Sequence, residues 1–309
     1  MRRLGMVVLL VCFVCSGALA STDWINQVGQ WNEAHRWSNG VPVGDDEIKI
    51  RGSDAVCVLD SDEVWSSLTN NRTRVYEGAT LIIAGGQLVG PGWLRAGAGD
   101  AGTIIQTGGL LKLQKGKDTS RLVVGDSGGS DGSYTISGGT LTYDTTDGGV
   151  GQLILGDRGG TGTFTVFGGG SVIEMGSLHV GGREAGRGAD GTLKFVIDEL
   201  GITAIQVGDV ILDPDGDSST ATLILDLIGI GDADLSPSYL LVENLGSDPV
   251  EGIFDGMPEG TIVTLDTTAY YLTYTGGVGG NDIMLIPEPA TLLLFGLGGL
   301  IAVRRPRKK

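Results

Sequence analysis

The sequence is poor in cysteine, histidine, proline and aromatic residues. Its 309 residues include 3 Cys, 2 His and 9 Pro, and aromatic residues make up 6%. Cys12 and Cys15 lie in an N-terminal apolar segment, which leaves Cys57 for the folded body. One cysteine cannot form an intramolecular disulfide, so the chain must fold without a disulfide framework. Cys57 lies in an apolar run and is predicted to be a buried core residue.

Few residues offer catalytic or metal-binding chemistry. The histidines are His35 and His179, and His179 is expected at the surface because it alternates outward from a predicted strand. The sequence contains no His-Glu-x-x-His motif. Paired carboxylates are plentiful, so a polysaccharide lyase or hydrolase stays open as an alternative, although no pair stands out. We expect a protein that is not an enzyme.

Basic charge is also scarce. There are 21 Lys and Arg against 37 Asp and Glu, a formal net charge of −16. Without residues 1–20 and 304–309, 14 basic residues face all 37 acidic ones, a formal net charge of −23. Such a body argues against nucleic acid or an anionic membrane surface as partner. Cations, cationic polymers and neutral glycans stay open.

Glycine, in contrast, is abundant, with 55 residues. It has no strict three-residue period, which excludes collagen. Gly-Gly pairs that begin at 85, 108, 138 and 168 each follow a short apolar run, at spacings of 23, 30 and 30 residues. A second repeated motif, a short apolar run that ends in glycine, alternates with these pairs at spacings of 28, 31, 25 and 27 residues. A period of about 20–50 residues is typical of a solenoid, propeller or array.

These repeats predict an all-β fold, a parallel β-helix (β-solenoid). Tyr134-Thr-Ile136 and Phe164-Thr-Val166 alternate with strand period, and no repeat contains a stretch of helix length. About 160 residues at this period give about six coils. Polar turns at 126–132, 157–162 and 181–191 occur at one phase of the repeat. We expect them to line up on one face of the solenoid, where binding would take place.

Residues 21–51 carry a tryptophan cluster, Trp24, Trp31 and Trp37. The stretch 30–42 resembles the opening segment common in secreted bacterial β-helix and β-repeat proteins. We predict a cap that covers the first coil. Alternatively, the three rings could be exposed, contact sugars and make this a glycan-binding module.

The segment 213–285 carries stronger apolar runs. Its closing order is Phe254…Pro258-Glu-Gly-Thr, then Tyr-x-x-Tyr-x-Gly-Gly, then Asn281-Asp-Ile-Met-Leu285. This order resembles the closing segment of proteins with autotransporter-associated β-strand repeats. The resemblance implies antiparallel strands that finish and cap the solenoid.

One acidic turn is a candidate for Ca²⁺ binding. Asp213, Asp215 and Asp217 alternate around a glycine and could place several oxygens on a cation. An EF-hand would also need glutamate at the twelfth position, which is Ile224, so an EF-hand is excluded. We favour a solvated acidic turn over a weak Ca²⁺ site, and we expect no cofactor.

The N-terminus has the layout of a secretory signal peptide. Arg2 and Arg3 precede an apolar stretch at 4–14, and Ala18-Leu-Ala20 forms a small-residue cleavage site. The Sec translocon and signal peptidase are therefore expected partners, and the mature chain is predicted to begin at Ser21.

The C-terminus joins a short motif, an apolar stretch and a basic end. Pro287-Glu288-Pro289 is followed by an apolar stretch at 290–303 and by Arg304-Arg305. Fourteen residues span about 21 Å as a helix, against a hydrocarbon core of roughly 30 Å, which predicts a short transmembrane helix. A plain membrane anchor with its basic end in the cytoplasm is one interpretation.

The same layout resembles the PEP-CTERM sorting tail of exported bacterial proteins. The resemblance implies recognition by an exosortase, a membrane transpeptidase that cuts near the motif and removes the helix. Membrane contact through that helix would then be transient, as with other cleaved anchor signals.

Together these features predict an exported, exosortase-processed structural or adhesive protein of the cell surface or the exopolysaccharide matrix, with exopolysaccharide as a further candidate partner. A glycan-binding module and a polysaccharide-degrading β-helix enzyme are the alternatives. The predicted segments are a signal peptide at 1–20, a Trp-rich cap at 21–51, a glycine-rich solenoid at 52–212, a C-terminal β segment at 213–285 and a sorting tail at 286–309.

Overall fold

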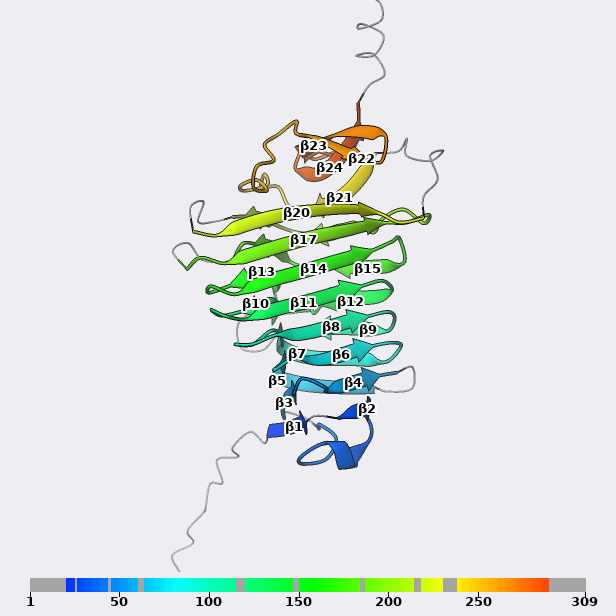
Figure 1. Cartoon of the computed structure of the whole chain (residues 1–309), viewed down its shortest axis with the longest axis vertical. Coiled ribbons are helices and arrows are strands. Elements are labelled where there is room, and N and C mark those ends of the chain that lie inside the picture. The colour runs from blue at the N-terminus through cyan, green and yellow to red at the C-terminus, as the bar shows by residue number, and fades with distance from the viewer. Residues whose placement is uncertain are drawn as a thin grey trace, which may run out of the picture.

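The computed structural model describes residues 21–288, apart from 26, 44–45, 61–63, 115–119, 147–149, 184–186, 214–217 and 230–237. Its strands stack as coils along one axis, and a small antiparallel sheet closes the C-terminal end (Figure 1). The described residues contain no α-helix, and one short 3-10 helix, η1 (Ala34–Arg36), lies near the N-terminus. The predicted all-β parallel solenoid is therefore confirmed.

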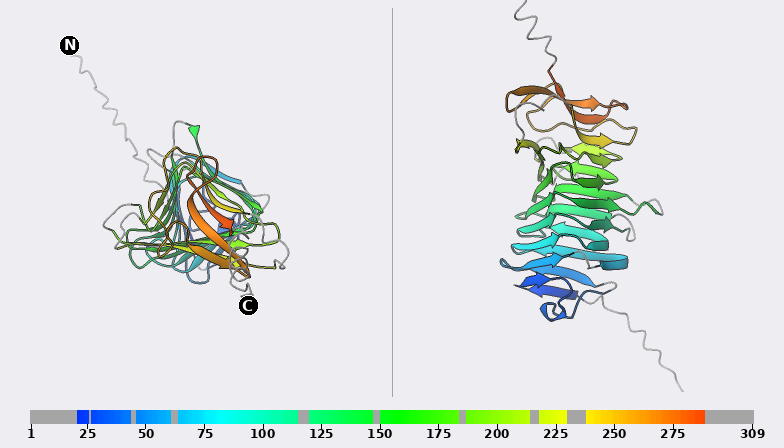
Figure 2. Two further views of the ribbon diagram at one scale, coloured as in Figure 1. Left: turned by 90° about the horizontal axis from the view of Figure 1, so that it is seen from above. Right: turned by 90° about the vertical axis from the view of Figure 1, so that its right-hand side faces the viewer.

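The solenoid has three faces, which give it a three-sided outline when it is viewed along its axis (Figure 2). Face 1 is a parallel ladder of eight strands. Its strands are β2 (Val28–Gln30), β4 (Val56–Leu59), β6 (Ala79–Ile83), β8 (Gly102–Gln106), β11 (Asp131–Ile136), β14 (Thr161–Phe167), β17 (Asp190–Ile197) and β20 (Thr220–Leu227). Six of them, β4 to β17, lie within residues 52–212, so the prediction of about six coils is confirmed.

Faces 2 and 3 are linked by two long strands, β5 (Val64–Tyr76) and β7 (Gln87–Ala96). The first half of β7 pairs with face 2 through residues 87–89, and its second half pairs with face 3 through residues 93–96. Face 2 continues through β9 (Leu110–Leu113), β12 (Gly139–Tyr143), β15 (Ser171–Glu174), β18 (Ile205–Val207) and β21 (Tyr239–Asn244). Face 3 contains β1 (Ser21–Ile25), β3 (Glu47–Arg51), β10 (Ser120–Asp126), β13 (Gly151–Asp157), β16 (Ser177–Val180) and β19 (Val210–Leu212).

The Gly-Gly pairs form the corner between faces 1 and 2. Gly109 and Gly139 follow one another in consecutive coils with φ of 68° and 81°, a conformation that residues with a Cβ rarely adopt. Each corner also donates a backbone hydrogen bond to the coil before it, as from Thr140 N to Gly109 O at 2.8 Å. The repeated glycine pair therefore sets both the turn and the stacking of successive coils.

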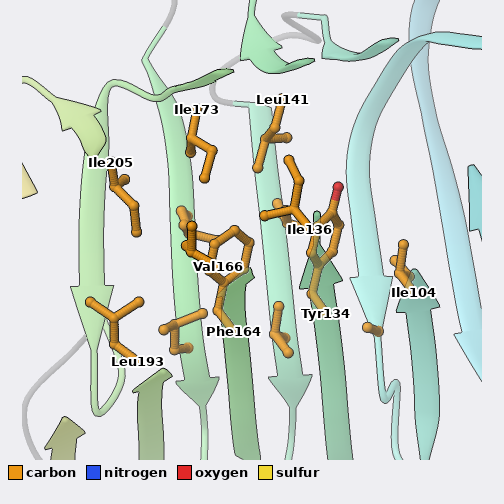
Figure 3. Close-up of a cluster of buried hydrophobic side chains, with 14 of the residues drawn as sticks. Ile104, Tyr134, Ile136, Leu141, Phe164, Val166, Ile173, Leu193 and Ile205 are labelled. Carbon is orange, nitrogen blue, oxygen red and sulfur yellow. The ribbon is translucent and has the colours of Figure 1, made fainter. Parts of the chain in front are cut away.

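The core consists of apolar rows that run along the axis, one residue from each coil (Figure 3). Ile104, Tyr134, Phe164 and Leu193 are register partners on consecutive face 1 strands, and each is 0% exposed. The rings of Tyr134 and Phe164 stack with centroids 5.1 Å apart. Each such side chain contributes about 1.5–3 kcal/mol by burial, which explains how the described part of the chain, with Cys57 as its one cysteine, is stable.

A row of glycines lies at the other end of the face 1 strands, where two segments of backbone approach closely. Gly132 pairs with Gly162, and a Cβ built on Gly162 would lie 1.9 Å from the carbonyl oxygen of Val124. Ala79 and Ala221 occupy the two ends of this row. The interior coils therefore require glycine at this position because there is no room for a Cβ atom, and not because the backbone has a positive φ.

The parallel ladders extend beyond residues 52–212 at both ends. At the start, β1 pairs with β3 and β2 pairs with β4, both in parallel, so residues 21–51 supply the first rungs. At the end, the apolar run expected to open an antiparallel segment is β20, which pairs in parallel with β17 over eight residues. That part of the prediction is wrong, because β20 keeps the same inward alternation and register as the coils beneath it.

The antiparallel closing sheet begins after β20. Strand β24 (Asp282–Pro287) pairs with β21 on one side and with β23 (Thr268–Gly276) on the other, and β23 pairs with β22 (Ile262–Leu265). Its position above the last coils is visible at the top of Figure 1. The predicted antiparallel end is confirmed for this sheet.

Candidate functional site

The candidate sorting motif begins inside the closing sheet. Pro287 is the last residue of β24 and pairs with Tyr270 of β23. The backbone N–H of Glu288 donates to the carbonyl of Ala269 at 3.0 Å. Pro289, Arg304 and Arg305 lie outside the described residues, as does the predicted transmembrane helix. The folded body therefore extends through the first two residues of the motif.

Strand β24 is held in the body by apolar burial and by a polar clamp. Ile283 and Leu285 are 0% exposed, which fixes the strand's inward face. The Asn281 side-chain amide donates to the carbonyl of Gly246 at 2.8 Å, and the Asp282 carboxylate accepts from the backbone N–H of Asn244 at 2.9 Å. The Asn-Asp-Ile-Met-Leu sequence thus joins the closing sheet to β21.

A second clamp ties the loop before β22 to the sheet. The Tyr274 hydroxyl donates to the carbonyl of Met257 at 2.6 Å and accepts from the backbone N–H of Phe254 at 3.0 Å. Burial raises the pKa of Tyr274 to about 12, so the hydroxyl keeps its proton at neutral pH. Together the two clamps hold the closing sheet, and with it strand β24, which leads into the tail.

No helix in the described part of the chain is long and apolar enough to cross a membrane.

The three tryptophans are core residues. Trp24, Trp31 and Trp37 are 0%, 2% and 4% exposed. Trp37 contacts the other two edge to face, with centroid distances of 5.1 and 5.0 Å, and its indole N–H donates to the carbonyl of Trp31. Buried rings cannot stack on a sugar, so the interpretation of these residues as glycan contacts is wrong. They cover the first coil from within.

The acidic turn is described in part. Asp213 accepts a hydrogen bond from the Ser219 hydroxyl at 2.7 Å, and its φ is 45°. Asp215 and Asp217 lie outside the described residues. The described residues contain no group of three or more His, Cys, Asp or Glu side chains placed to hold a metal. The solvated acidic turn stays the prediction and a weak Ca²⁺ site its alternative, and titration calorimetry with Ca²⁺ tests between them.

His179 is buried, contrary to the expectation from its outward position on β16. It is 6% exposed, and its Nε2 lies 3.1 Å from the Ser177 hydroxyl. Burial, with a smaller effect from Arg183 and Arg121, lowers the pKa of His179 to about 4, so the ring is neutral at pH 7. Among the described residues its Nδ1 has no hydrogen-bond partner, so no acidic group orients the pair for catalysis.

The polar turns between faces 3 and 1 stack as predicted. Asp126 and Asp157 are register partners at the ends of β10 and β13, and the turns that follow them bond to one another, as from Ser127 N to Asp157 O at 2.9 Å. The outer side of face 3, beside these turns, carries a feature that the sequence analysis missed. Three guanidiniums surround the Trp93 ring, with Cζ atoms 4.4 Å (Arg95), 5.1 Å (Arg121) and 5.3 Å (Arg72) from its centroid.

Comparison with known families finds one match, which covers the tail. Residues 285–308 match the model of the PEP-CTERM protein-sorting motif. No curated protein and no solved structure matches the chain. The match implies an exported protein targeted by an exosortase. The resemblance to autotransporter-associated repeats stays a prediction.

Proposed function

We propose that this protein is a structural or adhesive scaffold of the cell surface or the exopolysaccharide matrix, exported by its signal peptide and released from the membrane when an exosortase removes its tail. The observation that carries the proposal is the match at 285–308, which begins in the last strand of a closed solenoid. A folded body that ends where the sorting sequence starts is suited to release as one intact unit.

The fold supports a scaffold role on physical grounds. Each coil contacts its neighbours alone, so stability accumulates along the axis and the chain needs neither disulfide nor cofactor to stay folded outside the cell. Cys57 is a buried core residue, as expected for an exported protein that folds without a disulfide framework. The stacked turns and face 3 supply a long exposed surface for contacts.

The sorting proposal is tested by replacing Pro287-Glu288-Pro289 with alanines in a host that carries an exosortase. We expect the variant to accumulate in the membrane fraction as a larger precursor, while the parent chain is recovered outside the cell. A control with alanine at Glu199 and Leu200, two exposed residues in a turn of the body, should be released like the parent. Normal processing of the motif variant would sink the proposal and leave the tail as a plain anchor.

The junction between β24 and the tail also leads us to expect a position for exosortase cleavage. Because residues up to Glu288 are hydrogen-bonded in the closing sheet, we expect cleavage to fall after Glu288. The proposal includes no catalytic activity. Turnover of a polysaccharide that is abolished by a carboxylate substitution would contradict that part.

A further inference from the structure

The outer side of face 3 gathers arginines from consecutive coils. Arg72 of β5, Trp93 of β7 and Arg121 of β10 are register partners, and Arg74 and Arg95 form the neighbouring row. These strands follow one another along the axis (Figure 1). Neighbouring strands lie about 4.8 Å apart, so the guanidiniums form a strip along the solenoid. We call this set, with Arg158 and Arg183 of the adjoining turns, the arginine strip.

Trp93 orders the centre of the strip. It lies between Arg72 and Arg121 in the register, and both guanidiniums are within 5.3 Å of its ring centroid. A guanidinium that stacks on an aromatic ring keeps its N–H edge available for a carboxylate or sulfate. The ring therefore holds the guanidiniums of Arg72 and Arg121 in position, and Arg121 Nε also donates to the Gln152 side-chain carbonyl at 2.9 Å.

Two carboxylates of the strip, Asp126 and Asp157, lie beneath the guanidiniums. The side chains of Asp126 and Asp157 are 2% and 5% exposed, whereas Arg158, which contacts both, is 37% exposed. Arg95 pairs with Asp126 at 2.8 Å, and Arg183 pairs with Asp157 at 3.7 Å. Solvent therefore meets the cations of these pairs and not the anions.

Charge is unevenly distributed over the molecule as a result. The strip holds six arginines, and four of them form its ion pairs with three carboxylates, Glu47, Asp126 and Asp157. Burial lowers the pKa of Arg95 to about 10, which leaves it charged at neutral pH. The whole chain, by contrast, has a formal net charge of −16. A positive strip on so acidic a body indicates a narrow polyanion as its partner.

We propose that the arginine strip binds a linear acidic polysaccharide through its carboxylates or sulfates. An extended polymer matches donors spread over successive coils, and arginine edges bind such anions in bidentate geometry. A single glycan chain is narrow enough to touch the strip alone, whereas a nucleic-acid duplex or a vesicle would also meet the acidic surface around it. This inference rests on the proposed function, because an exported protein is the one that meets matrix polysaccharides.

The test is binding of the purified full-length chain to immobilised polygalacturonate, with dextran as the neutral comparison. We expect binding to polygalacturonate that weakens as salt is raised, and none to dextran. The double variant R72Q/R121Q should bind about 100-fold more weakly, since each charged hydrogen-bonding group contributes roughly tenfold. The control K112Q/K194Q removes the same charge from faces 2 and 1 and should change affinity less than about twofold.

Trp93 acts as a positioning residue, which a second variant tests. Trp93→Leu keeps every arginine, so the salt dependence of binding should be unchanged while affinity falls about three- to tenfold, and Trp93→Phe should restore most of it. Far-UV circular dichroism and melting temperature verify that each variant is folded.

Several results would overturn the inference. One is an equal loss of affinity for polygalacturonate in R72Q/R121Q and K112Q/K194Q. The others are no binding to polygalacturonate at low salt, and binding to single-stranded DNA or phosphatidylglycerol vesicles that is tighter than binding to polygalacturonate. Self-association that R72Q/R121Q abolishes, without glycan binding, would assign the strip to a second copy of the chain. Binding is measured on the purified chain, so its failure leaves the sorting proposal intact, and failed sorting leaves the strip intact.

Discussion

The hydrogen bond between Tyr134 and Gln106 offers a quantitative test of how the core tolerates a polar pair. The Tyr134 hydroxyl donates to the Gln106 side-chain carbonyl, and the Gln106 amide donates to the carbonyl of Thr140 at 3.0 Å. Both side chains are 0% exposed. Burial raises the pKa of Tyr134, so its hydroxyl stays protonated and remains the donor.

Tyr134→Phe removes the hydroxyl and keeps the stack on Phe164. It should cost about 1–3 kcal/mol, because the buried Gln106 carbonyl loses its donor. Gln106→Leu should cost a similar amount, since it leaves the Tyr134 hydroxyl without its acceptor and also removes the bond to Thr140.

The double variant should cost less than the sum of the single ones. Gln106 lies between Ile83 and Ile136 in the register, so an aliphatic side chain continues an existing apolar row. Replacing both partners by apolar groups is nearly neutral when the shape is kept. We expect a coupling energy of about 1–2 kcal/mol from urea unfolding followed by circular dichroism. Additive costs, or a Tyr134→Phe variant as stable as the parent, would refute this account of the pair.

Three further predictions concern stability. The folded chain keeps His179 neutral down to about pH 4, whereas in the unfolded chain this side chain takes up a proton near pH 6.5. As pH falls from about 6.5 to about 4, the free energy of unfolding of the parent should therefore decrease by about 3 kcal/mol relative to that of His179→Gln. Denaturant unfolding curves of the two proteins at several pH values measure this difference. Gly162→Ala should cost about 3 kcal/mol or more by its clash with backbone, whereas Gly128→Ala, with a nearest atom at 3.9 Å, should be nearly neutral; equal melting temperatures would contradict the glycine row. Trp37→Ala should cost about 3–5 kcal/mol by calorimetry, and an unchanged melting temperature would show that the ring is not a core residue.

The repeat architecture was predictable because it rests on local chemistry. Gly-Gly pairs such as Gly138-Gly139 mark corners, and the alternation of Tyr134 and Ile136 marks an inward face. Each coil can therefore be recognised from a stretch of about ten residues. The antiparallel end was predicted from the closing order between Phe254 and Leu285, which resembles the closing segment of proteins with autotransporter-associated β-strand repeats.

What the sequence could not show is which residues meet across coils. Arg72, Trp93 and Arg121 are separated by 21 and 28 residues, and their register depends on bends and turns of unequal length. In composition, Arg72 and Arg121 are two of 21 basic residues in an acidic chain, and Trp93 is one of 5 tryptophans. His179 was misplaced for a related reason: strand alternation predicts which side a residue faces, but not whether other segments cover that side.

The central claim is that a folded solenoid is released from its tail, and the intact mass of the extracellular protein tests it most directly. When the protein is expressed with an exosortase, the extracellular form should begin at Ser21, retain Glu288 and lack the basic residues 304–309. An extracellular protein that still ends at Lys309, or one cut within β24, would contradict the account.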